Sequence, residues 1–191
     1  MDDKILIRRI SEGDQHALRL LIENNRNLVW HIIVSLVGNS SDGEDLFQEA
    51  FLRVFKGIRH FRSDSRLSTW IGSIAHHVCV DYLRKKKREM SVHSYDTDIK
   101  QVSNISTGVG GNITEKEDLK KIILAAIARL PQDFRTVITL YHLDECSYRD
   151  IAEITGMPDG TVKSYISRGR NLLREILVSL VPDLAEIRHD E

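Results

Sequence analysis

Apolar residues recur at helical spacing along almost the whole chain, and this pattern constrains the fold more than any other feature of the sequence. Residues three and four positions apart share one face of an α-helix, so each such segment predicts an amphipathic helix. The alternation of single apolar and polar residues that predicts strands does not occur. An all-α fold is therefore expected, with helices over residues 2–11, 14–37, 42–59, 67–88, 115–129, 132–143, 147–154 and 159–178.

The helical pattern is interrupted by one long polar stretch that contains three glycines near its end. Structureless stretches of this length are uncommon inside a compact domain, so the stretch is interpreted as a flexible linker between two small helical domains. The expected organisation is a first domain at 1–90, a linker at 91–114, a second domain at 115–180 and an acidic tail at 181–191.

Composition excludes several classes of protein. The 191 residues are 41% hydrophobic and 29% charged, with a formal net charge of −1, as in ordinary soluble proteins. No apolar run approaches the roughly 20 residues that a membrane span needs, and the N-terminal residues lack the features of a secretion signal. Cys79 and Cys146 are far apart and indicate neither a disulfide framework nor a zinc site. A cytoplasmic protein without membrane insertion is expected.

A basic helix near the C-terminus follows a turn that is typical of DNA-binding motifs. Residues 147–154 predict a short helix, and Gly156 supplies the permissive backbone of a tight turn. Met157 is expected to plug the junction, and Asp159 to cap the next helix. The outer side of that helix carries Lys163, Ser164, Ser167, Arg168, Arg170, Asn171 and Arg174. Charge alone would equally fit a solvated surface, but the turn and the cations together predict a helix-turn-helix that reads the DNA major groove.

The helix over 42–59 has a second surface besides its buried face. It is expected to open with a capping box made by Ser41 and Glu44. Its buried side is expected to consist of Leu46, Phe47, Ala50, Phe51, Val54, Phe55 and Ile58. The second surface presents Asp45, Gln48, Glu49 and Leu52. It fits a protein partner, although single exposed leucines are also common where nothing binds.

Residues 61–88 combine aromatic rings with positive charge. A polar loop that carries Phe61 and Arg62 leads into a helix that buries most of Trp70, and the helix ends in the basic run 84–88. Unpaired bases stack on rings while phosphates meet cations, so this segment predicts a second nucleic-acid surface. A solvated helix end above an ordinary core tryptophan would explain the same residues without nucleic acid.

These segments resemble one known family along nearly the whole chain. "DGEDLFQEAF" at 42–51 resembles the part of sigma domain two that binds the clamp helices of RNA polymerase. "STWIGSIAHHVCVDYLRKKKR" at 68–88 resembles the helix that melts and reads the promoter −10 element, and residues 130–173 resemble sigma domain four, which binds the −35 element. The chain is identified as a member of the small extracytoplasmic-function (ECF) group of sigma-70 family sigma factors, which lack the additional N-terminal region and third domain of housekeeping sigma factors.

The resemblance implies a promoter-specificity subunit that directs transcription initiation at −10/−35 promoters of a stress or envelope-type regulon. The implied partners are promoter DNA, an anti-sigma factor and core bacterial RNA polymerase, through the clamp helices of its largest subunit and the flap of its second-largest subunit. No cofactor, metal or catalytic residue is implied, because nucleotide addition belongs to the polymerase.

The resemblance also assigns roles to individual residues. The polymerase-binding residues would be Asp45, Gln48, Glu49 and Leu52. The −10 residues would be Phe61, Arg62, Ser65, Arg66, Thr69, Trp70, His76, His77, Arg84 and Lys85. The −35 residues would be Tyr148, Arg149, Gly160, Thr161, Lys163, Ser164, Ser167 and Arg168.

One residue departs from the family pattern. His77 stands where the family usually has Asn, and its ring offers a different set of donors and acceptors. The −10 preference is therefore expected to deviate from that of the group. A metal site at His76, His77 and Cys79 is not expected, because adjacent helical residues point about 100° apart.

Two other functions fit parts of the sequence. A conventional regulator that binds an operator as a dimer would also carry a helix-turn-helix, but it needs no polymerase-binding surface and would protect DNA by itself. A nuclease would need a carboxylate cluster or a nucleophile beside a base, and neither spacing occurs.

Overall fold

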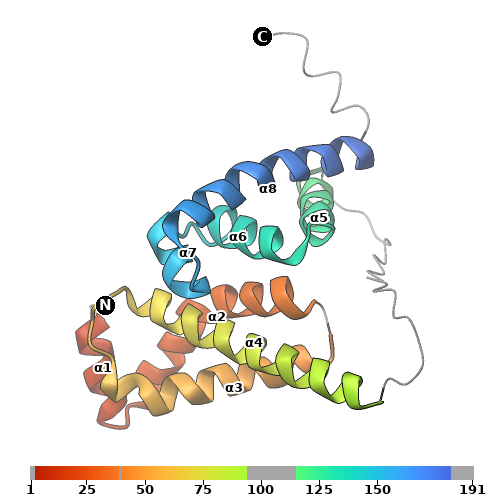
Figure 1. Ribbon diagram of the computed structural model, residues 1–191. Coiled ribbons are helices and arrows are strands. Elements are labelled where there is room, and N and C mark those ends of the chain that lie inside the picture. Colours follow the sequence, from red (N-terminus) through yellow and green to blue (C-terminus); the bar gives the residue numbers. More distant parts are fainter. Residues whose placement is uncertain (1–2, 39, 94–114, 182–191) are drawn as a thin grey trace.

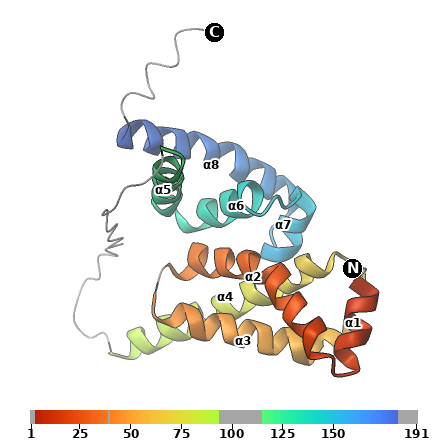
Figure 2. The ribbon, with the colours of Figure 1, turned by 180° about the vertical axis from the view of Figure 1, so that it is seen from behind.

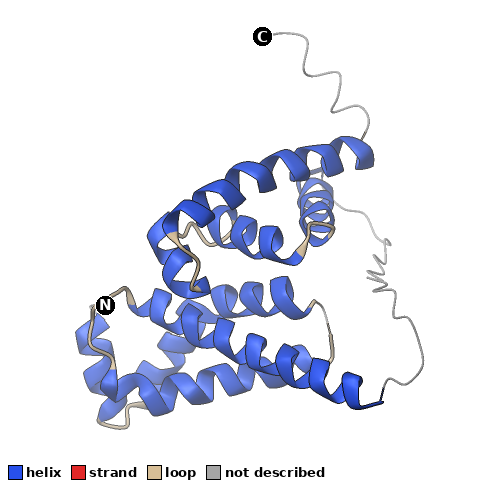
Figure 3. Ribbon diagram, viewed as in Figure 1, coloured by secondary structure: helices blue, strands red, loops and turns tan. Residues whose placement is uncertain are grey.

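The computed structural model describes residues 3–38, 40–93 and 115–181 (Figure 1). Its elements are α1 (Asp3–Ser11), α2 (Gln15–Val37), α3 (Asp42–Gly57), the 3-10 turn η1 (Ile58–His60), α4 (Leu67–His93), α5 (Glu115–Ala128), α6 (Gln132–His142), α7 (Tyr148–Thr155) and α8 (Asp159–Leu180). These residues contain no strand, which confirms the predicted all-α fold (Figure 3). The expected linker and acidic tail lie almost entirely outside the described residues.

Helices α1 to α4 form the first unit, in which α2 and α3 pack against each other and against α4 (Figure 2). Helix α2 starts at a strong cap, because Asp14 accepts hydrogen bonds from the backbone N–H groups of His16 and Ala17 at 2.9 and 3.1 Å. Its apolar face contributes Ile33 to the core, where α4 contributes Ile71, and both side chains are fully buried. Burial of each such side chain stabilises the fold by about 1.5–3 kcal/mol.

Helices α5 to α8 form the second unit, which contains the predicted helix-turn-helix. Helix α7 begins with a capping box, in which Ser147 and Asp150 each bind the other's backbone N–H. It ends at Gly156, whose left-handed φ of 72° lets its N–H bind the Ala152 carbonyl at 2.8 Å. Met157 packs on the core beneath the turn. The predicted turn chemistry is confirmed.

Two predicted helix caps are wrong. Ser41 precedes α3, but its backbone is already helical and its side chain makes no capping hydrogen bond, so it forms no capping box with Glu44. Asp159 does not cap α8, because Pro158 occupies that position and Asp159 lies in the first turn. Its negative charge there still interacts favourably with the positive end of the helix dipole.

Two further expectations about the first unit are corrected. Phe55 is 51% exposed, although it was expected on the buried side of α3. Helix α3 ends two residues later at Gly57, and Ile58, which was also expected on the buried side, is buried in the 3-10 turn that follows. Helix α4 continues to His93, five residues beyond the predicted end at Arg88.

The two units share one continuous apolar core. Helix α2 packs on α6, and α4 packs on α7, so residues of both units join a single cluster (Figure 1). Ile32 and Ile71 of the first unit meet Leu140, Ile151 and Ile154 of the second in this cluster, and all five are fully buried. The sequence predicted two domains but indicated no contact between them.

The core of the second unit has no room for a side chain at Gly169 on α8. A Cβ at this position would lie 2.8 Å from Cγ1 of Ile138, which is itself fully buried. We expect Gly169→Val to lower the free energy of unfolding by roughly 1–3 kcal/mol, as overpacked cores do. Urea denaturation measures this change. Gly160→Ala on the same helix is the control, because a Cβ there meets nothing within 4 Å; equal stability of the two variants would contradict the prediction.

Candidate nucleic-acid and polymerase interfaces

The outer face of α8 presents the predicted cations to solvent. Lys163, Ser167 and Arg168 are exposed, and Ser164 is half-buried. Nη2 of Arg168 lies 3.1 Å from Oγ of Ser164 and donates to it, while the guanidinium carbon lies 5.2 Å from the centre of the Tyr165 ring. A guanidinium held over a ring has lost part of its rotamer freedom before it meets a ligand. Arg168 is therefore pre-oriented beside the exposed Lys163.

The N-terminal end of α8 and the start of α7 flank this face. Gly160 is exposed and Thr161 is half-buried at the beginning of α8, so the backbone here is open to close approach. Arg149 is exposed on α7, and the Tyr148 ring stacks on Tyr141 with their centres 5.4 Å apart. The structure thus brings all eight predicted −35 residues onto the helix-turn-helix.

The side chain of Arg170 on α8 is held by residues of α6 within the same unit. Its guanidinium carbon lies 5.1 Å from the centre of the Tyr141 ring, and its Nε donates to Nε2 of His142 at 3.3 Å. Burial lowers the pKa of His142, and the positive charge of Arg170 lowers it further. A neutral His142 accepts the hydrogen bond that holds Arg170.

The loop between η1 and α4 carries the first predicted −10 residues. Arg62 and Arg66 are exposed, and Ser65 is half-buried. Phe61 and Trp70 contact each other with ring centres 5.3 Å apart. Trp70 is half-buried and lies so close to Gly57 that a Cβ there would be 3.2 Å from its ring. The tryptophan is thus largely a packing residue.

His76 and His77 lie in different environments on α4. Burial lowers the pKa of His76, and the neighbouring His77 lowers it further, so His76 is neutral at physiological pH. His77 is exposed, and its Nδ1 lies 2.6 Å from the carbonyl oxygen of Ser73. A carbonyl can only accept, so Nδ1 carries the proton and Nε2 of the neutral ring is an acceptor. No group of three or more possible metal ligands occurs among the described residues.

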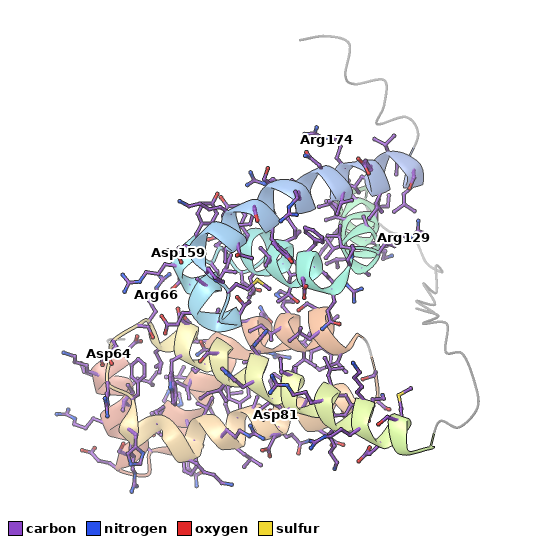
Figure 4. The ribbon with its side chains drawn as sticks, viewed as in Figure 1. Asp64, Arg66, Asp81, Arg129, Asp159 and Arg174 are labelled. Atoms are coloured by element: carbon purple, nitrogen blue, oxygen red, sulfur yellow. The ribbon has the colours of Figure 1, made fainter. Side chains whose placement is uncertain are left out.

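The C-terminal part of α4 is a basic surface. Arg84 and Lys85 are exposed there, as predicted. This surface contains a hollow of about 680 Å³, which is lined by Asp81, Arg84, Lys87, Arg88 and Ser91. Figure 4 shows Asp81 on the side of α4 that faces away from the second unit. Lys87 and Arg88, the last residues of the predicted basic run 84–88, thus line this hollow together with Arg84.

The predicted polymerase-binding residues lie along one stripe of α3. Asp45, Gln48 and Leu52 are exposed, and Leu52 is 53% accessible. Glu49 accepts a hydrogen bond from Nε of Arg53 at 2.8 Å, and Arg53 also reaches Asp81 of α4 at 3.3 Å. Glu49 therefore also holds α3 on α4, a role that its spacing did not indicate.

Two features adjoin this stripe and were missed in the sequence: an exposed phenylalanine and a hollow. Phe55 continues it one turn beyond Leu52, since i and i+3 share a helix face. The hollow of about 370 Å³ lies beside it between α2 and α3 and is lined by Arg26, Asn27, Trp30, Glu44, Phe47 and Gln48. Trp30, which lines this hollow, is 37% exposed, but the helical periodicity of its segment assigned it no role.

Contacts between the units involve predicted DNA-binding residues. Thr69 of α4 donates from Oγ1 to Oδ1 of Asp150 at 2.6 Å, and Arg66 lies 3.9 Å from Oδ2 of the same carboxylate. Figure 4 shows Arg66 at the junction of the two units. Burial raises the pKa of Asp150, but hydrogen bonds from Ser147 and Thr69 outweigh this effect, so the net shift is downward. The carboxylate is therefore ionised.

The helix-turn-helix with its cationic outer face defines a DNA-binding protein, which is made of two helical units. Family models support the same division: "Sigma-70 region 2" matches residues 21–89, and "Sigma-70, region 4" matches residues 120–173. The chain belongs to the sigma-70 family of RNA polymerase sigma factors, in its extracytoplasmic-function group.

Individual relatives agree with this assignment. The ECF RNA polymerase sigma factor SigW of Bacillus subtilis is 32% identical over 91% of this chain and 96% of its own length. The ECF RNA polymerase sigma-E factor of Escherichia coli K12 is 34% identical over 91% of this chain and 93% of its own length. The sigma factor RpoE of Bartonella quintana, solved in complex with the anti-sigma factor NepR, has a TM-score of 0.63 and 28% identity over 87% of this chain and 97% of that chain.

No helix in the described part of the chain is long and apolar enough to cross a membrane.

Proposed function

We propose that this protein binds core bacterial RNA polymerase through the stripe on α3 and directs initiation at promoters that the two units read together. The observation that carries the proposal is the distribution of exposed groups. Acidic and apolar residues gather on α3, while the outer face of α8 is cationic. A charge-complementary stripe with an apolar centre suits a basic protein partner, and a cationic helix after a tight turn suits DNA.

In this proposal the two units have separate tasks. The second unit reads the −35 element with Lys163 and Arg168, and Gly160 lets the backbone approach a phosphate. In the first unit, the loop at 61–66 holds a base that has left the opened duplex, and the basic end of α4 meets its phosphates. Capture of the base offsets the few kcal/mol of unstacking.

The remaining parts of the proposal rest on the relatives. A regulon of the stress or envelope type, action in the cytoplasm, contact with the polymerase flap and control by an anti-sigma factor are proposed from the family. The relative from Bartonella quintana is described in complex with such an anti-sigma factor. The protein itself contributes no catalytic residue in this proposal, since its surfaces bind the polymerase and position it on promoter DNA.

Transcription by purified core polymerase tests the proposal. The protein is added to core polymerase and a library of promoter fragments randomised at the −10 and −35 elements. We expect transcripts only when both protein and polymerase are present, with enrichment at both elements. Protection of DNA by the protein alone, with no transcription when polymerase is added, would instead support an operator-binding regulator.

The proton position of His77 yields a sharper prediction for the −10 element. The acceptor at Nε2 pairs with a base amino group, whereas Asn offers a donor and an acceptor together. We expect His77→Asn to change the preferred base at one −10 position by about 1–3 kcal/mol of discrimination while leaving the −35 preference unchanged. Sequencing of transcripts from the randomised library measures both preferences. Identical −10 preferences of the wild type and the variant would contradict this role for His77.

A further inference from the structure

A carboxylate lies in the middle of the surface that the proposed function assigns to the −10 strand. Asp81 follows His77 by four positions and precedes Arg84 by three, so the three side chains share one face of α4, and all are exposed. The hollow at the end of α4 has the same mixture, since its described lining combines Asp81 with three cations. A strand whose base contacts His77 and whose phosphates contact Arg84 would pass this negative charge and be repelled by it.

The charge of Asp81 is compensated by an arginine of another helix. Nη1 of Arg53 on α3 donates to Oδ2 of Asp81 at 3.3 Å. The same guanidinium donates from Nε to Oε1 of Glu49 at the shorter distance of 2.8 Å. The hydrogen bond to Glu49 is also the largest cause that raises the pKa of Arg53, ahead of the hydrogen bond to Asp81. Arg53 is therefore shared by two acids and interacts more strongly with Glu49.

The two acids belong to different proposed interfaces. Glu49 is part of the polymerase stripe on α3, whereas Asp81 lies among the proposed −10 residues of α4. We propose that Arg53 couples these interfaces: when polymerase engages Glu49, Arg53 turns fully to Asp81 and neutralises it, which strengthens binding of the −10 strand. The inference rests on the proposed function, which assigns the two surfaces to polymerase and to DNA.

Competition for Arg53 sets the direction of the coupling. A basic group of the polymerase that pairs with Glu49 takes the acceptor of Arg53 Nε and repels the guanidinium. Asp81 already accepts from Nη1, so the change needs rotation of one side chain and no movement of α3 or α4. The effect is reciprocal, because DNA that is bound beside a neutralised Asp81 draws Arg53 away from Glu49 and leaves Glu49 free for polymerase.

Exposure of these side chains limits the size of the coupling. The side chains of Arg53, Glu49 and Asp81 are 43%, 46% and 56% exposed. Exposed ion pairs change an equilibrium constant by up to about fivefold. Salt screens such pairs, so the coupling should become smaller as the ionic strength rises.

The variant Arg53→Met tests the inference, because it keeps an unbranched, helix-forming side chain and removes the shared charge. We expect it to bind core polymerase about threefold more tightly, since Glu49 is freed. Its complex with polymerase should bind single-stranded −10 DNA about fivefold less tightly, since Asp81 is left uncompensated. Fluorescence anisotropy at low salt measures both affinities. Arg8→Met is the control, because the ion pair of Arg8 with Glu12 lies outside both surfaces.

A second substitution distinguishes charge compensation from a merely structural tie between α3 and α4. Asp81→Asn breaks the same ion pair but also removes the repelling carboxylate, so the double variant Arg53→Met/Asp81→Asn should regain DNA affinity to within about twofold of the wild type. Equal or weaker polymerase binding by Arg53→Met, unfolding of that variant, or no recovery in the double variant would overturn the inference. If the wild-type complex with polymerase neither binds −10 DNA nor directs transcription, the proposed function itself is refuted.

Glu49→Gln imitates the transfer of Arg53 in the absence of polymerase. The amide holds the guanidinium less strongly than the carboxylate does, so Arg53 should move to Asp81 in the free protein. We expect this variant to bind single-stranded −10 DNA about threefold more tightly than the wild type, although it loses an acid of the polymerase stripe. Asp45→Asn is the matched control, because it makes the same change of charge on the same stripe. Equal DNA affinities of the two variants would show a general effect of charge and would overturn the coupling through Arg53.

Discussion

Replacing Asp45 and Leu52 together by arginine is expected to lower the affinity for core RNA polymerase by roughly 100-fold, as when two interface residues each contribute about 1.4 kcal/mol. Both side chains are exposed on the stripe of α3, so the substitutions place two positive charges where the proposal needs an acid and an apolar contact. Surface changes of this kind alter stability little. Glu49 is left unchanged, because it holds Arg53 against α4. Pull-down with core polymerase measures the change.

The matched control for this variant is Glu12→Arg. Glu12 is another exposed acid, and it follows α1 directly. We expect it to bind polymerase like the wild type, although it carries a similar reversal of charge. Thermal unfolding of both variants at the wild-type temperature would show that the fold is retained. If the Asp45→Arg/Leu52→Arg variant binds core polymerase with wild-type affinity, the stripe on α3 is not the polymerase-binding surface.

Lys163→Ala and Arg168→Ala are each expected to weaken promoter use, but in different ways. Lys163 lies on the first exposed turn of α8 and is assigned to a base edge, so its loss should relax the preference at one −35 position by about 1–3 kcal/mol. Arg168 is held by Ser164 and Tyr165 and is assigned to a phosphate or a second base. In the phosphate case, its loss should weaken binding uniformly and reduce the salt slope by about one.

Transcription across a library randomised at the −35 element, repeated at several salt concentrations, separates these outcomes. Polymerase binding should not change in either variant, because the stripe lies on the other unit. Arg174→Ala is the control, since Figure 4 shows Arg174 far along α8 from the turn. If Lys163→Ala and Arg168→Ala both match the wild type in output and preference, the cationic face is only a solvated surface.

The positions of the helices followed from periodicity alone. Predicted and observed helices differ by no more than two residues at most ends, because burial of one face decides where an amphipathic helix begins and stops. The caps were less predictable. Ser41 with Glu44 had the capping spacing and did not cap, whereas Ser147 with Asp150 did. Spacing admits a cap, but the path by which the chain enters the helix decides whether the hydroxyl meets the N–H groups.

Candidate site residues could be predicted from the sequence where their exposure depends on a single helix. Steps of 100° placed Lys163 and Arg168 on the outer face of α8, and both are exposed. The same reasoning put both Phe55 and Ile58 in the core; Ile58 is buried, but Phe55, near the end of α3, is half exposed. The second role of Glu49 could not be found either, since its partner Arg53 reaches a residue of another helix.

Local sequence alone determined the helices, the turn at Gly156 and the cationic face, because each depends on residues within a few positions of one another. Only the tertiary structure decided that the two units meet. The carboxylate of Asp150 and the hydroxyl of Thr69 are 81 positions apart, and no periodicity relates them. Their contact depends on the shapes of two finished helical surfaces, on Gly72 leaving room for Ile154, and on burial that no single segment provides.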